Sequence, residues 1–233
     1  KGDVSILFAD MRNSTKFTDD NSAKTVVKVY RSFLKTITRA IRVCHGNVRD
    51  FIGDGVLAVF SDKEIDGEII SSSKQAVIAG KMICTLIDYC LNPKLKEKFN
   101  VVIGYGIGIC TGTVLATKVG MRGNEKNPDL ENETGTIWIG SCTNYASKFC
   151  GVATSGEIVI DKNTYTKQSC NQSWVPTQRI KGDAIYDCFI SSSNYLEIEA
   201  NTVPVSIQTD LINNSVGVQI STAITERLDE YDS

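Results

Sequence analysis

Hydrophobic and polar residues alternate along several short segments of the chain, and each such segment predicts a β-strand. The first runs from Val4 to Met11, and two more, at 48–51 and 56–60, flank a turn rich in Gly and Asp. These turn residues predict a tight hairpin over Asp50–Gly55, with the Asp54 carboxylate beside two glycines. Further strands are expected at 101–109, 114–119, 136–139, 157–160 and 184–190.

Apolar residues at intervals of three and four predict amphipathic helices from Ala23 to Ile41 and from about Ser71 to Cys90, the second ending before Pro93. A helix capped by Ser141 and a short helix over 161–166 follow. The polar segment 120–133 has no periodicity and predicts a mobile loop. Glycines at every second position of the strand 101–109 leave one face flat, and we expect a helix to pack closely against it.

The order of these elements predicts an α/β (α+β) domain over residues 1–190, with a largely antiparallel, ferredoxin-like sheet flanked by helices. The pattern weakens over 191–233, where we expect a C-terminal extension with one strand at 203–212 and a short helix at 221–231. The first residues, Lys1-Gly2-Asp3, do not resemble a signal peptide, and we expect them to continue from an earlier part of a longer chain.

Composition narrows the choice of function. With 233 residues, a net charge of −2 and a pI near 5.6, the chain is not expected to bind nucleic acid. No apolar run reaches the roughly 18 residues that a membrane helix needs, so no stable membrane insertion is expected. The eight cysteines form no CxxC pair, and we expect them to be small buried side chains rather than disulfides. This usage predicts a reducing compartment, the cytoplasm. The single histidine, His45, follows a helix and is expected to help cap it.

Two carboxylates stand out as candidate chemistry. Asp10 ends the first strand, and if that strand neighbours the hairpin, Asp10 and Asp54 meet at one edge of the sheet. Paired carboxylates of this kind suit two hard cations that clamp a polyphosphate. The alternative is that Asp54 is only a turn residue. Backbone amides after Arg12 could face an anion, and Asn144 and Lys148 share one helix face.

Four segments in the correct order resemble the catalytic domain of the class III nucleotidyl cyclases, the adenylate and guanylate cyclase family. They are Leu7–Met11, Phe51–Phe60, Gly106–Gly112 and Ile139–Lys148. The resemblance implies two Mg²⁺ or Mn²⁺ ions at Asp10, Met11 and Asp54, and catalytic roles for Asn144 at the ribose and Lys148 at the α-phosphate. It also implies phosphate contacts from Ser14, Thr15 and Lys181. Since this chain carries both halves of the family's site, a homodimer with composite active sites is implied.

The positions that correspond to base recognition are Asp50 and Ile137, each three residues before a motif glycine. Neither matches the residues that the family uses for adenine or guanine. The helix segment Asn144–Lys148, the opening Asp10–Thr15 and the segment 119–124 together make the chain similar to the bacterial pyrimidine cyclases of the Pycsar antiphage systems, which make cyclic UMP or cyclic CMP as a signal for an effector protein. The expected substrate is UTP or CTP. The alternatives are an adenylate or guanylate cyclase and an inactive dimerisation or nucleotide-binding module.

Overall fold

The protein is built on an eight-stranded sheet, seen in a computed structural model that describes residues 2–65, 67–121, 133–168 and 174–196. The order is β2-β3-β1-β6-β8-β10-β9, with β7 paired to β6, and all pairs are antiparallel except β6 with β8. The strands are β1 (Gly2–Arg12), β2 (Asn47–Ile52), β3 (Gly55–Phe60), β6 (Gly104–Met121), β7 (Glu133–Ile139), β8 (Glu157–Ile160), β9 (Trp174–Lys181) and β10 (Ala184–Ser191). The predicted α+β class with a largely antiparallel sheet is confirmed.

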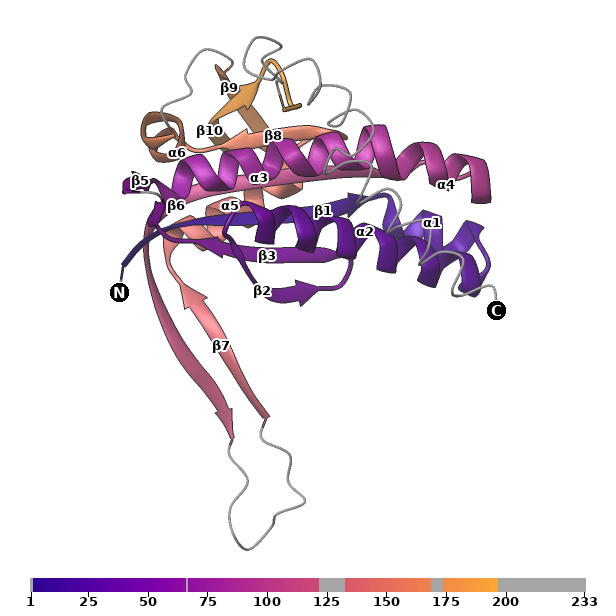
Figure 1. The fold of residues 1–233 in the computed structure, drawn as a ribbon, viewed down its shortest axis with the longest axis horizontal. Helices are drawn as coiled ribbons and strands as arrows, with labels where there is room; N and C mark the ends of the chain where they lie inside the picture. Colours follow the sequence, from indigo (N-terminus) through magenta and orange to yellow (C-terminus); the bar gives the residue numbers. More distant parts are fainter. Residues whose placement is uncertain (1, 66, 122–132, 169–173, 197–233) are drawn as a thin grey trace, which may run out of the picture.

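Helices cover both faces of this sheet (Figure 1), with α2 and α3 in front of β1 and α5 behind it. The helices are α1 (Ser14–Asp20), α2 (Ala23–Val43), α3 (Ser72–Leu86), the π-helical turn η1 (Ile87–Leu91), α4 (Asn92–Phe99), α5 (Ser141–Val152) and α6 (Lys162–Lys167). A small separate hairpin joins β4 (Lys63–Ile65) to β5 (Glu68–Ile70). No helix in the described part of the chain combines the length and apolar character needed to cross a bilayer.

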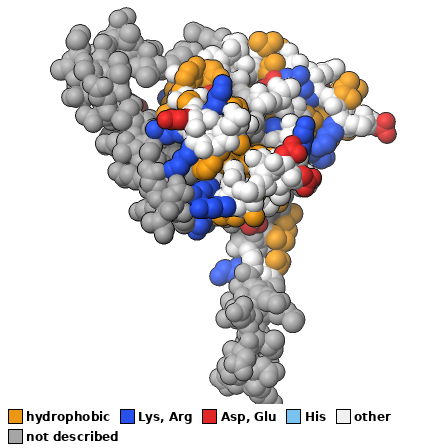
Figure 2. Space-filling view, turned by 90° about the vertical axis from the view of Figure 1, so that its right-hand side faces the viewer, with side chains coloured by type: hydrophobic (Ala, Val, Ile, Leu, Met, Phe, Trp, Pro, Cys, Tyr) orange, Lys and Arg blue, Asp and Glu red, His pale blue; other side chains and the backbone are white. Residues whose placement is uncertain are grey.

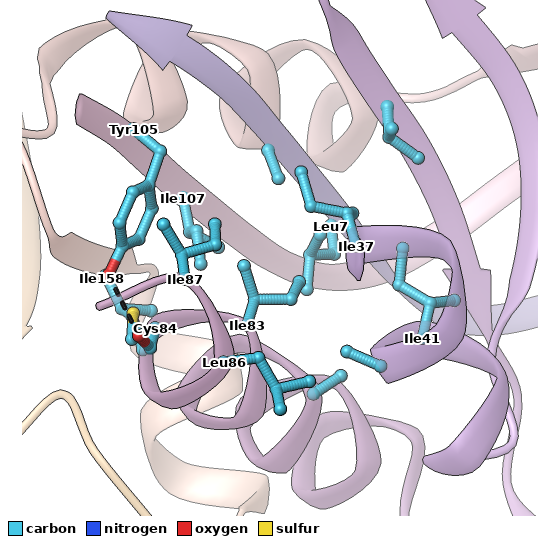
Figure 3. Packing of buried hydrophobic residues seen from close by; sticks show 14 of the residues in the cluster. Leu7, Ile37, Ile41, Ile83, Cys84, Leu86, Ile87, Tyr105, Ile107 and Ile158 are labelled. Carbon is cyan, nitrogen blue, oxygen red and sulfur yellow. Dashed lines mark hydrogen bonds between the residues drawn. The ribbon is translucent and has the colours of Figure 1, made fainter. Parts of the chain in front are cut away.

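The larger core lies between the sheet and helices α2 and α3 (Figure 3). Leu7 of β1 meets Ile37 and Ile41 of α2 and Ile83 of α3, and all four side chains are fully buried. The alternation in β1 therefore places odd-numbered residues on this face. Its even-numbered residues, beginning with Val4 and Ile6, join a second cluster beneath α5, and Asp10 continues that row.

Glycines of β6 allow α5 to lie directly on the sheet, which confirms the predicted close packing. A Cβ atom placed on Gly108 would overlap the backbone of Ala146 and lie 2.9 Å from the Cα atom of Cys150. A Cβ atom on Gly112 would lie 3.2 Å from that of Cys142, at the start of the same helix. The flat face predicted from the glycine spacing is thus the seat of α5.

Substitution of Gly108 by Ala should therefore lower the free energy of unfolding by about 3 kcal/mol, the upper end of the range for overpacking, because both elements are rigid there. The measurement is denaturant unfolding followed by circular dichroism. The matched control is Gly135→Ala in β7, where an added Cβ has no neighbour within 4 Å. Equal stability of the two variants would contradict close packing of α5.

Three sequence predictions need correction. The expected strands at 101–109 and 114–119 are not separated by a turn around Gly112, because β6 runs unbroken from Gly104 to Met121 alongside β1, β7 and β8. The helix expected to end before Pro93 continues through η1 into α4, because Pro93 stands in the first turn, where no amide donor is needed. Ser141 is the first residue of α5 and Gly140 precedes it, so Ser141 is not the cap.

Other differences concern the ends of elements. Residues 101–103 are not part of β6, since the side-chain amide of Asn92 hydrogen-bonds both the backbone amide and the carbonyl of Ile103. The short helix α1 and the strands β4, β5 and β9 were not predicted, whereas α6 was, with Asp161 accepting hydrogen bonds at its start. β6 and β7 extend into both ends of the predicted loop, whose residues 122–132 lie outside the described part, as does the expected extension beyond residue 196.

The cysteine and histidine predictions can be compared with the described residues. Seven cysteines are described and all are free; six of them are buried, as expected, and Cys90 is half-buried. His45 follows the end of α2 with a φ of 62°, and its backbone amide donates to the carbonyl of Arg42. His45 therefore helps to end the helix, as predicted.

Candidate active site

The β2–β3 hairpin brings Asp54 against the end of β1. Gly53 takes a φ of 61°, which suits glycine in this tight turn. A Cβ atom on Gly55 would lie only 2.9 Å from the Oδ1 atom of Asp10, so the bare backbone of Gly55 makes the close approach possible. β1 is a central strand, and the two carboxylates therefore meet at one end of the strands rather than at a lateral edge of the sheet.

The negative charges of the two carboxylates repel each other. Burial raises the pKa of Asp10, and the neighbouring charge of Asp54 raises it further, while Arg12 acts in the opposite direction. The Oδ2 atom of Asp54 is buried and has no hydrogen-bond partner among the described residues. Two adjoining oxygen-donor groups, one with an orphaned buried oxygen, fit a hard divalent cation. In the described ranges no group of three or more Cys, His, Asp or Glu side chains is placed to hold a metal ion, and this pair is the candidate metal centre.

Met11 lies beside Asp10 but faces the other way. Its side chain is buried in the core beneath α2 and α3. Of the three residues expected to hold metal, Met11 could therefore contribute only its main-chain oxygen. Ser14 and Thr15 stand in the first turn of α1, after Asn13 with a φ of 57°. The segment after Arg12, whose backbone amides could face an anion, is thus the start of a helix.

Asn144 and Lys148 lie on the exposed side of α5, whose other side carries the buried Ala146 and Cys150. The Nζ atom of Lys148 lies 5.2 Å from the ring centre of Tyr145 and 5.8 Å from that of Tyr186 on β10. These aromatic faces attract the ammonium group and hold it over one side of the helix.

Lys181 lies near the same helix. It ends β9, and a Cβ atom on Gly151 would lie 2.9 Å from its Nζ atom. Because Lys148 and Gly151 are three residues apart on a helix, the two ammonium groups flank a single face of α5. Lys148 and Lys181 thus lie near the same helix, with Lys148 over Tyr145 and Lys181 beside Gly151.

The carboxylates and the face of α5 are separate in the single chain. The end of α5 lies close to Asp10, because the Sγ atom of Cys150 donates to the carbonyl of Gly106, which pairs with Asp10. Asn144 and Lys148, however, lie on the exposed side of the helix, opposite the side that packs on the sheet. Among the described residues no hydrogen bond or ion pair joins Asp10 or Asp54 to Asn144 or Lys148. Within one chain the two sets of side chains are therefore not joined directly.

The candidate base-recognition residues lie on strands that contact each other. The guanidinium carbon of Arg49, next to Asp50, lies 5.3 Å from the ring centre of Trp138, next to Ile137. Ile137 is 42% exposed, and the Asp50 carboxylate accepts a hydrogen bond of 2.9 Å from the amide of Phe51. Asp50 on β2 and Ile137 on β7 are thus the chain neighbours of the two residues that make this contact.

Sequence reasoning missed the side chains that support these groups. Tyr186 and Trp138 were assigned no role, and Arg12 was considered only for the backbone that follows it. Arg12 lies 3.8 Å from the Oδ2 atom of Asp10 and also hydrogen-bonds the end of α5. The signal for that contact in the sequence was Gly106, because a side chain there would occupy the space of the Arg12 guanidinium.

Comparison with known proteins identifies relatives of the same kind. The family model described as the adenylate and guanylate cyclase catalytic domain matches residues 1–183. A uridylate cyclase of Burkholderia cepacia is 28% identical over 150 residues, which cover 64% of this chain and 59% of that protein. A uridylate cyclase of Gulbenkiania mobilis is 30% identical over 170 residues, covering 68% and 61%. The chain spans about three fifths of the length of these curated relatives.

Solved structures share the fold. The guanylyl cyclase Cya2 matches with a TM-score of 0.68 and 20% identity, covering 86% of this chain and 95% of its own. The adenylyl cyclase CyaB from P. aeruginosa matches with a TM-score of 0.64 and 18% identity, covering 86% and 97%. The family match spans most of the chain, including both carboxylates and α5. The chain therefore belongs to the adenylate and guanylate cyclase catalytic-domain family, the class III nucleotidyl cyclases.

Proposed function

We propose that this chain is the catalytic domain of a pyrimidine nucleotide cyclase, which converts UTP or CTP to the 3′,5′-cyclic monophosphate and pyrophosphate. The observation that carries the proposal is the pair of adjoining carboxylates, Asp10 and Asp54. Both lie within the residues that the cyclase family model matches. The relatives named uridylate cyclases support a pyrimidine base. UTP is the first candidate substrate.

Asp10 and Asp54 would hold Mg²⁺ or Mn²⁺, with the main-chain oxygen of Met11 as a further ligand. Bound there, two divalent ions would lower the pKa of the ribose 3′-hydroxyl and neutralise charge on the triphosphate. Their fit rests on the oxygen donor set and on the buried, unpartnered Oδ2 atom of Asp54.

The remaining residues position the triphosphate for attack. The 3′-oxygen bonds to the α-phosphorus, the bond to the bridging oxygen of the β-phosphate breaks, pyrophosphate leaves and the hydroxyl proton passes to solvent. Asn144 would orient the ribose, and Lys148 would meet the charge that develops on the α-phosphate. Lys181 and the backbone around Ser14 and Thr15 would bind the other phosphates. Such a reaction depends on positioning and charge more than on covalent catalysis.

Each active site would form between two copies of the chain. Asn144 and Lys148 lie on the side of α5 that is opposite the sheet, whereas Asp10 lies at the end of β1, and this supports the arrangement because one chain alone presents the two half-sites in different places. Figure 2 shows hydrophobic side chains along the projecting β6–β7 hairpin. The exposed ones include Leu115, Val119, Ile137 and Ile139, each at least 42% exposed. An apolar surface of this kind suits burial against a second copy.

Base selection would come from Asp50 and Ile137, the chain neighbours of the contacting residues Arg49 and Trp138. They differ from the residues that the family uses for purines, and this difference supports a smaller base. We also propose that the product acts as a second messenger in antiphage defence, read by an effector protein. A cytoplasmic location fits both a nucleoside triphosphate substrate and the free cysteines of the described part.

The test is to incubate the protein with Mn²⁺ and each of ATP, GTP, CTP and UTP separately, and to quantify cyclic nucleotide and pyrophosphate by chromatography and mass spectrometry. We expect turnover with UTP, and a lower rate with CTP, well above any rate with the purines. Turnover confined to ATP or GTP would replace the proposal with a purine cyclase. Binding of the triphosphates without any turnover would favour an inactive nucleotide-binding module.

A further inference from the structure

Arg12 connects the two half-sites of one chain. It is the last residue of β1, and its Nη1 atom lies 3.8 Å from the Oδ2 atom of Asp10. The same guanidinium donates from Nε to the carbonyl of Ala153 at 3.2 Å and from Nη2 to the carbonyl of Cys150. Both carbonyls belong to the end of α5. The side chain is 20% exposed, so these contacts are made in a largely dry environment.

Two glycines of β6 leave space for this guanidinium. Arg12 pairs with Gly104 across β1 and β6, and Asp10 pairs with Gly106. A Cβ atom on Gly106 would overlap the guanidinium of Arg12, and one on Gly104 would lie 3.3 Å from the Cβ atom of Arg12. Residues with side chains at these positions would push the guanidinium off the sheet. The glycines therefore hold Arg12 flat between β6 and α5.

The contacts of the Arg12 guanidinium with Asp10 and with the carbonyls of α5 are both electrostatically favourable. The last carbonyls of a helix have no amide donors within the helix, and a cation there is stabilised by the helix dipole. Asp10 is only partly buried, next to Asp54, and its carboxylate gains from a nearby positive charge. A planar guanidinium with several donors can serve both partners at once, which a lysine ammonium does less well.

We propose that Arg12 is a positioning residue that holds the Asp10 carboxylate and helix α5 in a set relation, and thereby links the two active sites of the dimer. The inference rests on the proposed function. In composite sites, the carboxylates of one subunit serve one active site, while Asn144 and Lys148 of that subunit serve the other. Each Arg12 therefore supports the carboxylates of one active site and helix α5 of the other.

The experiment uses heterodimers of the whole chain, purified through two different tags, with one Asp54→Ala subunit and one Lys148→Ala subunit. Such a dimer keeps a single working site, made of the carboxylates of the Lys148→Ala subunit and α5 of the Asp54→Ala subunit. Arg12→Met is then added to one subunit or the other, and kcat, KM for UTP and the Mn²⁺ concentration for half-maximal rate are measured. Thermal unfolding of each heterodimer is followed in parallel.

We expect kcat to fall roughly tenfold or more in both placements, because small displacements of reacting groups are costly. The two placements should differ in whether the Mn²⁺ requirement changes. In the Lys148→Ala subunit, Arg12→Met should raise the Mn²⁺ requirement; in the Asp54→Ala subunit, it should lower kcat with the Mn²⁺ requirement unchanged. Arg12→Lys should restore more of the rate in the first placement, where charge alone acts on Asp10, than in the second.

Full activity in either placement would overturn the linkage. So would equal losses in both placements with no change in the Mn²⁺ requirement, since loss of stability alone predicts that result. If Arg12→Met does not fold, Arg12→Gln, which can still donate to one helix carbonyl, is measured in the same two placements under the same criteria. An inactive parent heterodimer, without any change at Arg12, would instead refute the composite site and this inference with it.

Discussion

Asp54→Asn should reduce kcat for cyclisation by roughly a thousandfold or more while the protein remains folded. The substitution keeps the shape of the side chain and removes only its charge, at a group whose Oδ2 atom is buried without a partner. Loss of a single well-placed electrostatic group already costs about 10²–10³ in rate, and this carboxylate is one of the two that would hold metal. The measurement is steady-state kinetics with UTP over a range of Mn²⁺ concentrations.

Stability should change in the opposite direction to activity. Burial and then the charge of Asp54 raise the pKa of Asp10 in the folded protein, so the folded state binds more protons than the unfolded state between the ordinary and the raised pKa of Asp10. In that window the free energy of unfolding of the metal-free protein falls as pH rises. Asp54→Asn should weaken this fall and leave Tm at neutral pH equal to or above that of the unchanged protein.

The matched control is Asp19→Asn, on the exposed surface of α1, which removes one carboxylate far from any partner in the described structure. It should leave both kcat and the pH dependence of stability unchanged. Retained cyclisation in Asp54→Asn would remove Asp54 from the metal site. Lost activity together with a large drop in Tm would assign the hairpin a structural role instead.

Mixed Asp54→Ala and Lys148→Ala subunits should recover activity that neither variant has alone. In the proposed dimer, each homodimeric variant lacks a necessary group in both sites, whereas the heterodimer has one complete site. If subunits exchange freely, half of the dimers are heterodimers, so the mixture should reach roughly a quarter of the activity of the unchanged protein. The measurement is cyclic nucleotide formation after co-refolding or co-expression.

The control mixes Asp54→Ala with Asp10→Ala. Both changes affect the same half-site, so every dimer lacks a working carboxylate pair in both sites and no recovery is expected. Equal recovery in the two mixtures would contradict the composite arrangement. So would an absence of recovery with Lys148→Ala when analytical ultracentrifugation shows that heterodimers have formed.

Local patterns in the sequence were sufficient where a residue depends on its neighbours along the chain. The alternation in β1 and the glycines around Asp54 predicted a strand end and a hairpin, and the structure has both. The glycine repeat at 104–108 predicted a close-packed helix, and α5 occupies that place. Similar arguments failed at Gly112 and Pro93, because pairing with β1 and the first-turn position of Pro93 outweighed their local tendency to break an element.

The sequence by itself identified the side chains that are proposed to carry the chemistry: the carboxylates of Asp10 and Asp54, and the helix face with Asn144 and Lys148. Strand alternation and turn chemistry, which act within a few residues, pointed to the two carboxylates, and the resemblance to the class III cyclases pointed to Asn144 and Lys148. Only the tertiary structure decided how these groups are held. Arg12 bonds Cys150, which is 138 residues away, and Lys148 lies over Tyr186 of a distant strand. Such contacts depend on which elements pack together and in which register, and no local pattern specifies that packing.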